Sequence, residues 1–202
     1  MKKVIMFVLT AMVLSSCSDF IDLKPIDFPT EETFYKDVKG LEGAVIGIYD
    51  ELQSSDQYGA KFMTLMEVRG DNVKNDNSGA SGGITYQIEV FTETPANSNL
   101  SGAWLSLYKT IYRCNLVLQN VEVPMSDEQR SRIAGQASFI RALCYFNLVR
   151  LWGEVPIITK TQTVAEARNN KRAPIDEVYG QIISDLAVAK GLPAVWPESE
   201  RG

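Results

Sequence analysis

The stretch "SDEQRSRIAGQASFIRALCYFNLVRLWG", residues 126–153, decides the fold class of this chain. It begins with Ser126 and has Gln129 three residues later, which is the pattern of a helical capping box. Gly153 marks its end. Between these limits apolar side chains occupy more than half of the helical circumference, at Ile133, Ile140, Leu143, Phe146, Leu148 and Leu151. The pattern predicts one long helix in the interior of a helical bundle.

Helical periodicity recurs on both sides of this stretch. One helix is expected from a cap at Thr30 to a stop near Gly59, and a shorter helix closes at Gly70. A further helix starts at Trp104 and stops before Pro124, and the last covers residues 174–193. The expected inward positions are Phe34, Val38, Leu41, Val45, Ile48 and Leu52 in the first helix, Trp104, Tyr108, Ile111, Asn115 and Leu118 in the third, and Val178, Ile182, Leu186 and Ala189 in the last.

Residues 71–99 interrupt the helical pattern, because they are rich in Asn, Ser, Gly and Thr and show little periodicity. They are predicted to form a long loop, in which "ITYQIEVFT" at residues 84–92 is compatible with a short strand. A loop of this length in a compact protein is usually functional or mobile. The chain as a whole is predicted to be all-α, with tetratricopeptide-like helical hairpins, long loops and little β structure.

The first residues, "MKKVIMFVLTAMVLSSC", have the order of parts of a secretory signal, and the apolar run is too short to span a bilayer. "LSSC" resembles the lipobox of bacterial lipoproteins, which predicts a signal peptide at 1–16, lipidation of Cys17 and a tether over 17–29. Several acyl chains give stable membrane anchoring. Ser18, in place of aspartate, favours the outer membrane by resemblance to known sorting rules. The alternative is a plain signal peptide with a chance cysteine.

Composition excludes several classes of chemistry. The chain has no histidine, which removes His-based triads and His metal sites, and no cofactor or metal site is predicted. A net charge of −5 without a basic stripe argues against nucleic acid as a partner. Cys114 and Cys144 lie in apolar helical surroundings, and they are expected to be buried free thiols or, alternatively, a disulfide between neighbouring helices.

Six segments in register resemble SusD/RagB proteins, which are surface lipoproteins of nutrient uptake systems in Gram-negative bacteria. They are "CSDFIDLKP", "TEETFYKDVKGLEGAVIGIYDEL", "EVRGDN", "WLSLYKTIYRCNLVLQNV", "GQASFIRALCYFNLVRLWGEVPII" and "APIDEVYGQIISDLAVA". The resemblance implies a non-catalytic lipoprotein at the surface of the outer membrane. It would bind oligosaccharide or another nutrient for a SusC-like TonB-dependent transporter. Because members of the family are longer, residues 30–202 are expected to be an N-terminal helical domain that is incomplete at its C-terminus.

The resemblance also suggests ligand-binding residues, and further candidates come from their position in the long loop alone. Polar residues near the "GDN" position contribute to ligand contact in the family, which points to Asp71, Asn72 and Arg69. Tyr86, Asn97 and Asn99 are predicted from their place in the long loop alone. The competing interpretation is that Asp71 and Asn72 only cap and turn the chain.

Other conspicuous side chains have mainly structural interpretations. Trp104 and Tyr112 are possible sugar platforms, but their helical spacing is more typical of a core. Trp152 is expected to pack at a helix end, and Arg141 to pair with a buried acid or with carbonyls. The cluster of Arg168, Lys171 and Arg172 is predicted to be a solvated loop. No acidic pair stands out as the machinery of a glycosidase, and the alternative function is an assembly scaffold that grips a partner protein with its hairpins.

Overall fold

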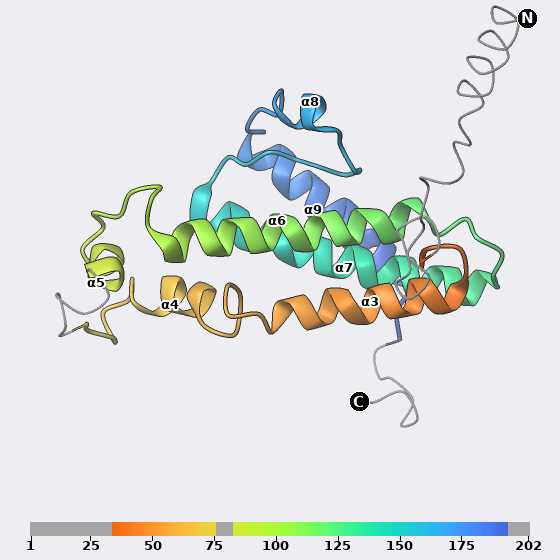
Figure 1. Ribbon diagram of the computed structural model, residues 1–202, viewed down its shortest axis with the longest axis horizontal. Coiled ribbons are helices and arrows are strands. Elements are labelled where there is room, and N and C mark those ends of the chain that lie inside the picture. The colour runs from red at the N-terminus through yellow and green to blue at the C-terminus, as the bar shows by residue number, and fades with distance from the viewer. Residues whose placement is uncertain (1–33, 76–82, 194–202) are drawn as a thin grey trace, which may run out of the picture. The chain divides into compact units, whose positions relative to one another are not determined.

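The computed structural model describes residues 34–75 and 83–193, and these form a bundle of α-helices (Figure 1). The chain divides after Phe34, and the helices named below belong to the second unit, which starts at Tyr35. Within the described residues there is no strand, only an isolated bridge between Val155 and Ala173. The all-α prediction is confirmed. The helices are α3 (Val38–Leu52), α4 (Lys61–Glu67), α5 (Ile84–Glu89), α6 (Ser98–Gln119), α7 (Asp127–Trp152), α8 (Val164–Ala167) and α9 (Ile175–Ala189).

Helix α7 is the centre of the bundle, as its sequence predicts. It packs against α3, α6 and α9, and it runs antiparallel to α6 and to α9 (Figure 1). The capping box between Ser126 and Gln129 is present in both directions. Gly153 ends the helix with a φ of 67°, a conformation that glycine adopts without steric cost. The helix is buried around most of its circumference because three neighbours cover it.

Several predicted boundaries differ from the structure. Helix α3 begins at Val38, where the Asp37 carboxylate accepts a hydrogen bond from the Gly40 N–H at 2.8 Å, whereas Thr30 lies outside the described residues. Helix α6 begins at Ser98, six residues before Trp104, because Asn97 caps it. Both differences come from a capping side chain that periodicity alone does not reveal.

Two assignments within elements are wrong. Residues 84–89, predicted as part of a long loop with a possible short strand, form helix α5, which places Ile88 in the core. A short apolar run fits either period, and a lone strand would have no partner for its backbone groups here. On α9 the buried position is Asp185, while the neighbouring Leu186 is exposed.

The buried Asp185 meets Arg141 of α7 in a two-point ion pair. Arg141 Nε and Nη2 donate to the two carboxylate oxygens at 2.9 and 2.6 Å. Arg141 Nη1 donates to Asn115 Oδ1 of α6 at 2.7 Å, and the Arg141 and Asp185 side chains are 9% and 3% exposed. The prediction that Arg141 pairs with a buried acid is confirmed. The pair joins α6, α7 and α9 at one point in the core.

The same region fixes the chain that leaves α7. The Tyr145 hydroxyl donates to the Ile158 carbonyl at 3.0 Å and accepts from the Ile158 N–H at 2.6 Å. Asn115 Nδ2 donates to that carbonyl too, at 2.9 Å. The Tyr108 hydroxyl donates to the Pro156 carbonyl at 2.8 Å. Residues 155–158 have no helical bonds of their own, so these side chains supply the partners that their backbone needs.

Cys114 and Cys144 are buried free thiols, so the first of the two expectations for them holds. Burial raises the pKa of Cys114 to about 12 and raises that of Cys144 well above its usual value. Both thiols are therefore protonated at neutral pH and lack nucleophilic character. No helix of the described residues is long and apolar enough to cross a membrane.

The ion pair gives a stability prediction. Replacing Arg141 by Met leaves the Asp185 carboxylate buried without a partner, and we expect the free energy of unfolding to fall by about 3–5 kcal/mol. The double variant Arg141→Met with Asp185→Leu should recover most of the loss. Urea unfolding followed by circular dichroism measures both effects.

Arg132 provides the matched control on the same helix, because its pair with Glu42 is at 2.9 Å but partly exposed. Arg132→Ala should change the free energy of unfolding by less than about 1 kcal/mol. An equal cost for both arginine variants would contradict a dominant role of the buried pair.

Candidate functional site

A folded segment joins α5 to the first turn of α6. Asn97 accepts a hydrogen bond from the Asn99 N–H at 3.0 Å and donates through Nδ2 to the Ile84 carbonyl at 2.8 Å and to Gln87 Oε1 at 3.1 Å. One buried amide therefore caps α6 and holds α5 against it. The segment between the two helices, residues 90–96, is positioned by this contact.

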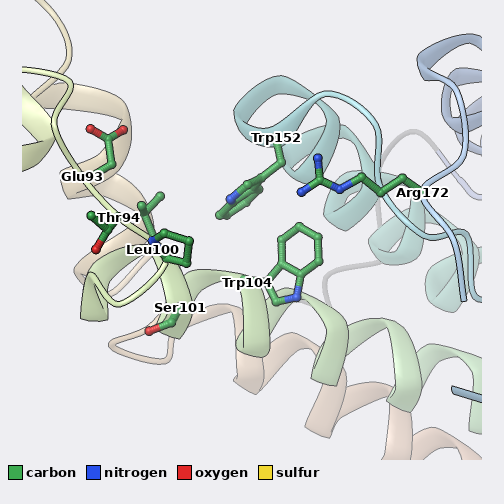
Figure 2. Close-up of a pocket in the computed structure, with 8 residues that line it drawn as sticks. Glu93, Thr94, Leu100, Ser101, Trp104, Trp152 and Arg172 are labelled. Carbon is green, nitrogen blue, oxygen red and sulfur yellow. The ribbon is translucent and has the colours of Figure 1, made fainter. Parts of the chain in front are cut away.

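A pocket of about 400 Å³ lies beside this segment. Its lining comes from four parts of the chain: the segment before α6, the first turns of α6, the C-terminal end of α7 and the connection that precedes α9 (Figure 2). The lining residues are Glu93, Thr94, Pro95, Leu100, Ser101, Trp104, Trp152 and Arg172. The pocket thus combines two indoles with hydroxyls, a carboxylate and a guanidinium.

The two tryptophans form its apolar wall. Trp104 and Trp152 are half-buried and meet edge to face, with ring centroids 5.2 Å apart and planes at 80°. Trp104 also lies against Tyr108, at 4.9 Å between centroids. This packing holds the indoles rigidly, since edge-to-face pairs are favoured over other arrangements. Trp104 and Trp152 both pack against the core and line the pocket.

Arg172 carries the positive charge of the pocket. Its guanidinium extends toward the two indoles (Figure 2). Among the described residues it has no hydrogen bond or ion pair. Burial raises the pKa of the nearby Tyr108 hydroxyl, and the positive charge of Arg172 partly offsets that rise. A guanidinium has five donors in a fixed plane. Arg172 can therefore donate to acceptor oxygens that enter the pocket.

Glu93 lies at the opposite end and is held by Arg69. The two side chains form an ion pair through Arg69 Nη2 and Glu93 Oε1. Arg69 Nε and Glu93 Oε2 are buried and find no hydrogen-bond partner among the described residues. Unsatisfied buried groups are uncommon and require an explanation.

Phe91 is strained next to this pair. It has a φ of 56°, which is unusual for a bulky residue and costs about 1–3 kcal/mol. Its ring lies over the Arg69 guanidinium, with 5.7 Å from the guanidinium carbon to the ring centroid, and it is 67% exposed. The cation–π contact helps to hold this conformation. An exposed aromatic face thereby stands two residues from the pocket lining.

Trp104, a possible sugar platform from the sequence, lines the pocket, whereas the residues predicted from the GDN motif and the long loop do not. Asp71 and Asn72 are exposed in the turn after α4, and Tyr86 is half-exposed on α5. Asn97 is 3% exposed and its side chain makes internal hydrogen bonds. Arg69 is the nearest in function, because it positions Glu93. The lipidation prediction at Cys17 lies outside the described residues.

The sequence interpretation missed Glu93 and assigned Trp152 and Arg172 to structural roles. Trp152 was expected only to pack at a helix end, and Arg172 to be part of a solvated loop. Little in the sequence indicated that Trp152 and Arg172 line a pocket. Trp152 lies next to Gly153 at the end of α7, and Arg172 lies two residues before Pro174, the N-cap of α9. Within residues 34–75 and 83–193 there is no group of three His, Cys, Asp or Glu side chains that could hold a metal ion.

Comparison with known proteins relates the chain to one family. A family model described as "Starch-binding associating with outer membrane" matches residues 19–200. The SusD-like protein P2 of Formosa agariphila is 32% identical over 193 residues, which are 94% of this chain and 38% of that protein. The SusD-like protein P25 of the same organism is 29% identical over 209 residues, covering 100% of this chain and 40% of the relative.

Solved structures agree on the fold. A SusD-like protein from Bacteroides fragilis superposes with a TM-score of 0.74 at 22% identity, covering 89% of this chain and 34% of the other. A laminarin-binding SusD-like protein superposes with a TM-score of 0.71 at 28% identity, covering 83% and 37%. The chain therefore spans only 34–40% of the length of these relatives.

The structural role of the buried Asn97 amide can be tested by substitution. Asn97→Ala removes the α6 cap and two contacts to α5, and we expect the free energy of unfolding to fall by about 1–2 kcal/mol. Asn99→Ala keeps the backbone N–H that donates to Asn97 Oδ1, so it should change the free energy of unfolding by less than about 0.5 kcal/mol. Thermal unfolding by circular dichroism distinguishes them, and equal stability of the two variants would argue against the capping role.

Proposed function

The chain belongs to the SusD-like family, and on that basis we propose that it is a non-catalytic surface lipoprotein that binds glycans. It delivers them to a TonB-dependent transporter of the outer membrane. The match covers nearly the whole chain, and the helical bundle is that of the solved relatives. Because the chain covers less than half of those relatives, the activity of a whole SusD-like protein is part of this proposal.

The pocket between α6 and α7 supports glycan binding. A sugar has apolar C–H faces and a rim of hydroxyl groups, so its site needs flat aromatic surfaces and a few fixed polar groups. Trp104 and Trp152 provide the aromatic surfaces, while Arg172 and Glu93 provide charged donors and acceptors at the two ends. The ligand oxygens would bond to the Arg172 guanidinium, which is otherwise free of hydrogen bonds among the described residues.

The ligand class rests on the family description and on one structural neighbour, in addition to the pocket. The family is described as starch-binding, and one structural neighbour binds laminarin. Both are neutral glucans, so a glucan is the first ligand to test. Glycoside hydrolysis uses a pair of carboxylates, and the described lining of the pocket contains one, that of Glu93. The proposal is therefore binding without cleavage.

The location follows from the N-terminus. We place the protein at the outer membrane through acyl chains on Cys17, since the family is described as associating with that membrane. Lipidation at this position would hold the protein at the membrane surface. Residues 17–29 would be the tether of this arrangement.

Arg172 provides the test of glycan binding. Arg172→Ala should weaken binding of starch or laminarin oligosaccharide at least about tenfold, because a charge-assisted hydrogen bond contributes about 1.5–3 kcal/mol. Lys171→Ala is the matched control: it is exposed, removes the same charge next to Arg172 and does not line the pocket. Isothermal titration calorimetry measures both, and equal losses would contradict binding in this pocket.

The partner requires a different experiment. We expect a mild-detergent pull-down of the lipidated protein from its native outer membrane to recover a TonB-dependent barrel in stoichiometric amount. Cys17→Ser removes the acceptor thiol and should release the protein from the membrane fraction. Recovery of assembly factors in place of a barrel would support the helical scaffold instead. Absence of any membrane partner would contradict delivery to a transporter.

A further inference from the structure

The connection between α7 and α9 carries an excess of positive charge. Residues 159–173 contain four cations and one acid, Glu166. The cations are Lys160, Arg168, Lys171 and Arg172. Glu166 is already engaged, since it caps α8 together with Thr163 and lies 3.8 Å from the Lys160 ammonium. The other three cations therefore have no acid in their own segment, although the whole chain has a net charge of −5.

The connection is held in shape on both sides of Arg172. The side-chain amides of Gln162 and Asn170 exchange two hydrogen bonds, at 3.1 and 2.7 Å. On the other side, the Ala173 N–H donates to the Val155 carbonyl at 3.0 Å, within the isolated bridge. The backbone that carries Arg172 is therefore anchored between these two contacts, close to the end of α7.

The pocket has a surplus of positive charge because its acid is neutralised. Glu93 is the one carboxylate of the described lining, and Arg69 pairs with it. The Glu93 side chain is only 13% exposed, so salt screens this pair little. Arg172 lies on the other side of the indoles and has no ion pair among the described residues (Figure 2). A neutral sugar needs a hydrogen-bond donor at this end, whereas the guanidinium supplies a charge as well.

One class of chemical group matches a guanidinium best. Its planar donors bind a carboxylate or a sulfate through two parallel hydrogen bonds, which are about twice as strong as bonds between neutral groups. The indoles of Trp104 and Trp152 lie next to it and offer a surface for the sugar ring that bears the group. Arg168 and Lys171 are exposed on the same connection, and their charges raise the positive potential at this end.

We propose that the pocket binds acidic glycans, and that a carboxylate or sulfate substituent of the sugar pairs with Arg172. This inference rests on the proposed glycan binding and narrows its ligand class. The uncharged part of the glycan lies against the indoles, as it would for starch or laminarin, and the substituent adds affinity. Both substituents offer two acceptor oxygens with a negative charge, so both belong to the class.

Matched oligosaccharides test the proposal on the 202-residue chain. The probes are a laminari-oligosaccharide, the same oligosaccharide with its primary hydroxyls oxidised to carboxylates, and its sulfated form. Isothermal titration calorimetry measures their affinities at low and at high salt. We expect both acidic probes to bind at least about tenfold more tightly than the neutral probe at low salt. The advantage should shrink at high salt, because salt screens a charge pair at an exposed side chain.

Substitution of Arg172 separates its charge from its hydrogen bonding. Arg172→Gln keeps a donor but removes the charge, so it should bind the acidic and neutral probes with equal affinity. Lys171→Gln is the matched control, because it removes the same charge at a neighbouring position outside the described lining. It should keep most of the advantage of the acidic probes. An equal loss in both variants would indicate unspecific attraction to the connection and would overturn the proposal.

The remaining outcomes distinguish this inference from the proposed function. Equal binding of neutral and acidic probes by the unaltered chain would overturn the preference for acidic glycans and leave glycan binding in place. Inorganic sulfate or acetate that binds as tightly as the acidic oligosaccharides would also overturn the inference, because the indoles would then contribute nothing. Absence of binding by all three oligosaccharides would contradict the proposed function itself, and the inference with it.

Discussion

The buried charge of Arg141 is the constraint on which the rest of the bundle depends. An unpaired guanidinium in the core would cost several kcal/mol, so every donor must meet an acceptor in a fixed place. Asp185 supplies two acceptors from α9 and Asn115 supplies one from α6. Three helices are thereby fixed in register by one side chain. Apolar packing alone would allow them to slide by a helical turn at smaller cost.

This constraint extends to the pocket. Asn115 bonds both to Arg141 and to the Ile158 carbonyl, which Tyr145 holds as well. The chain after α7 is therefore tied to the same network that holds the helices. Trp152 precedes this tied segment and Arg172 follows it, close to the bridge between Val155 and Ala173. Core contacts therefore hold the indole wall and the backbone next to Arg172, while the Arg172 side chain is exposed.

The elements that could be predicted from sequence are those with a strong local signal. Helix α7 could be predicted from sequence, because its capping box at Ser126, its periodicity and its stop at Gly153 each involve residues that are close in the chain. The burial of Asp185 could not be predicted, because a periodicity analysis places only apolar residues in the core. The partner of this acid, Arg141, lies 44 positions away in the chain. The capping role of Asn97 was not predicted for a related reason, since asparagine is favoured both as a helix cap and in loops. The pocket was hidden because Trp104 and Trp152 belong to different helices and look like core residues on each of them.

The placement of Asp185 has a consequence for the order of folding. The acid that neutralises Arg141 lies in the last described helix, so a growing polypeptide makes α6 and α7 before it makes their counter-charge. Contacts between distant positions form late because the loop between them must first close. Until α9 arrives, the guanidinium has to stay hydrated and the hairpin has to remain loosely packed. Every residue that lines the pocket precedes α9 in the chain, so the pocket residues are synthesised before the acid that fixes the helices around them.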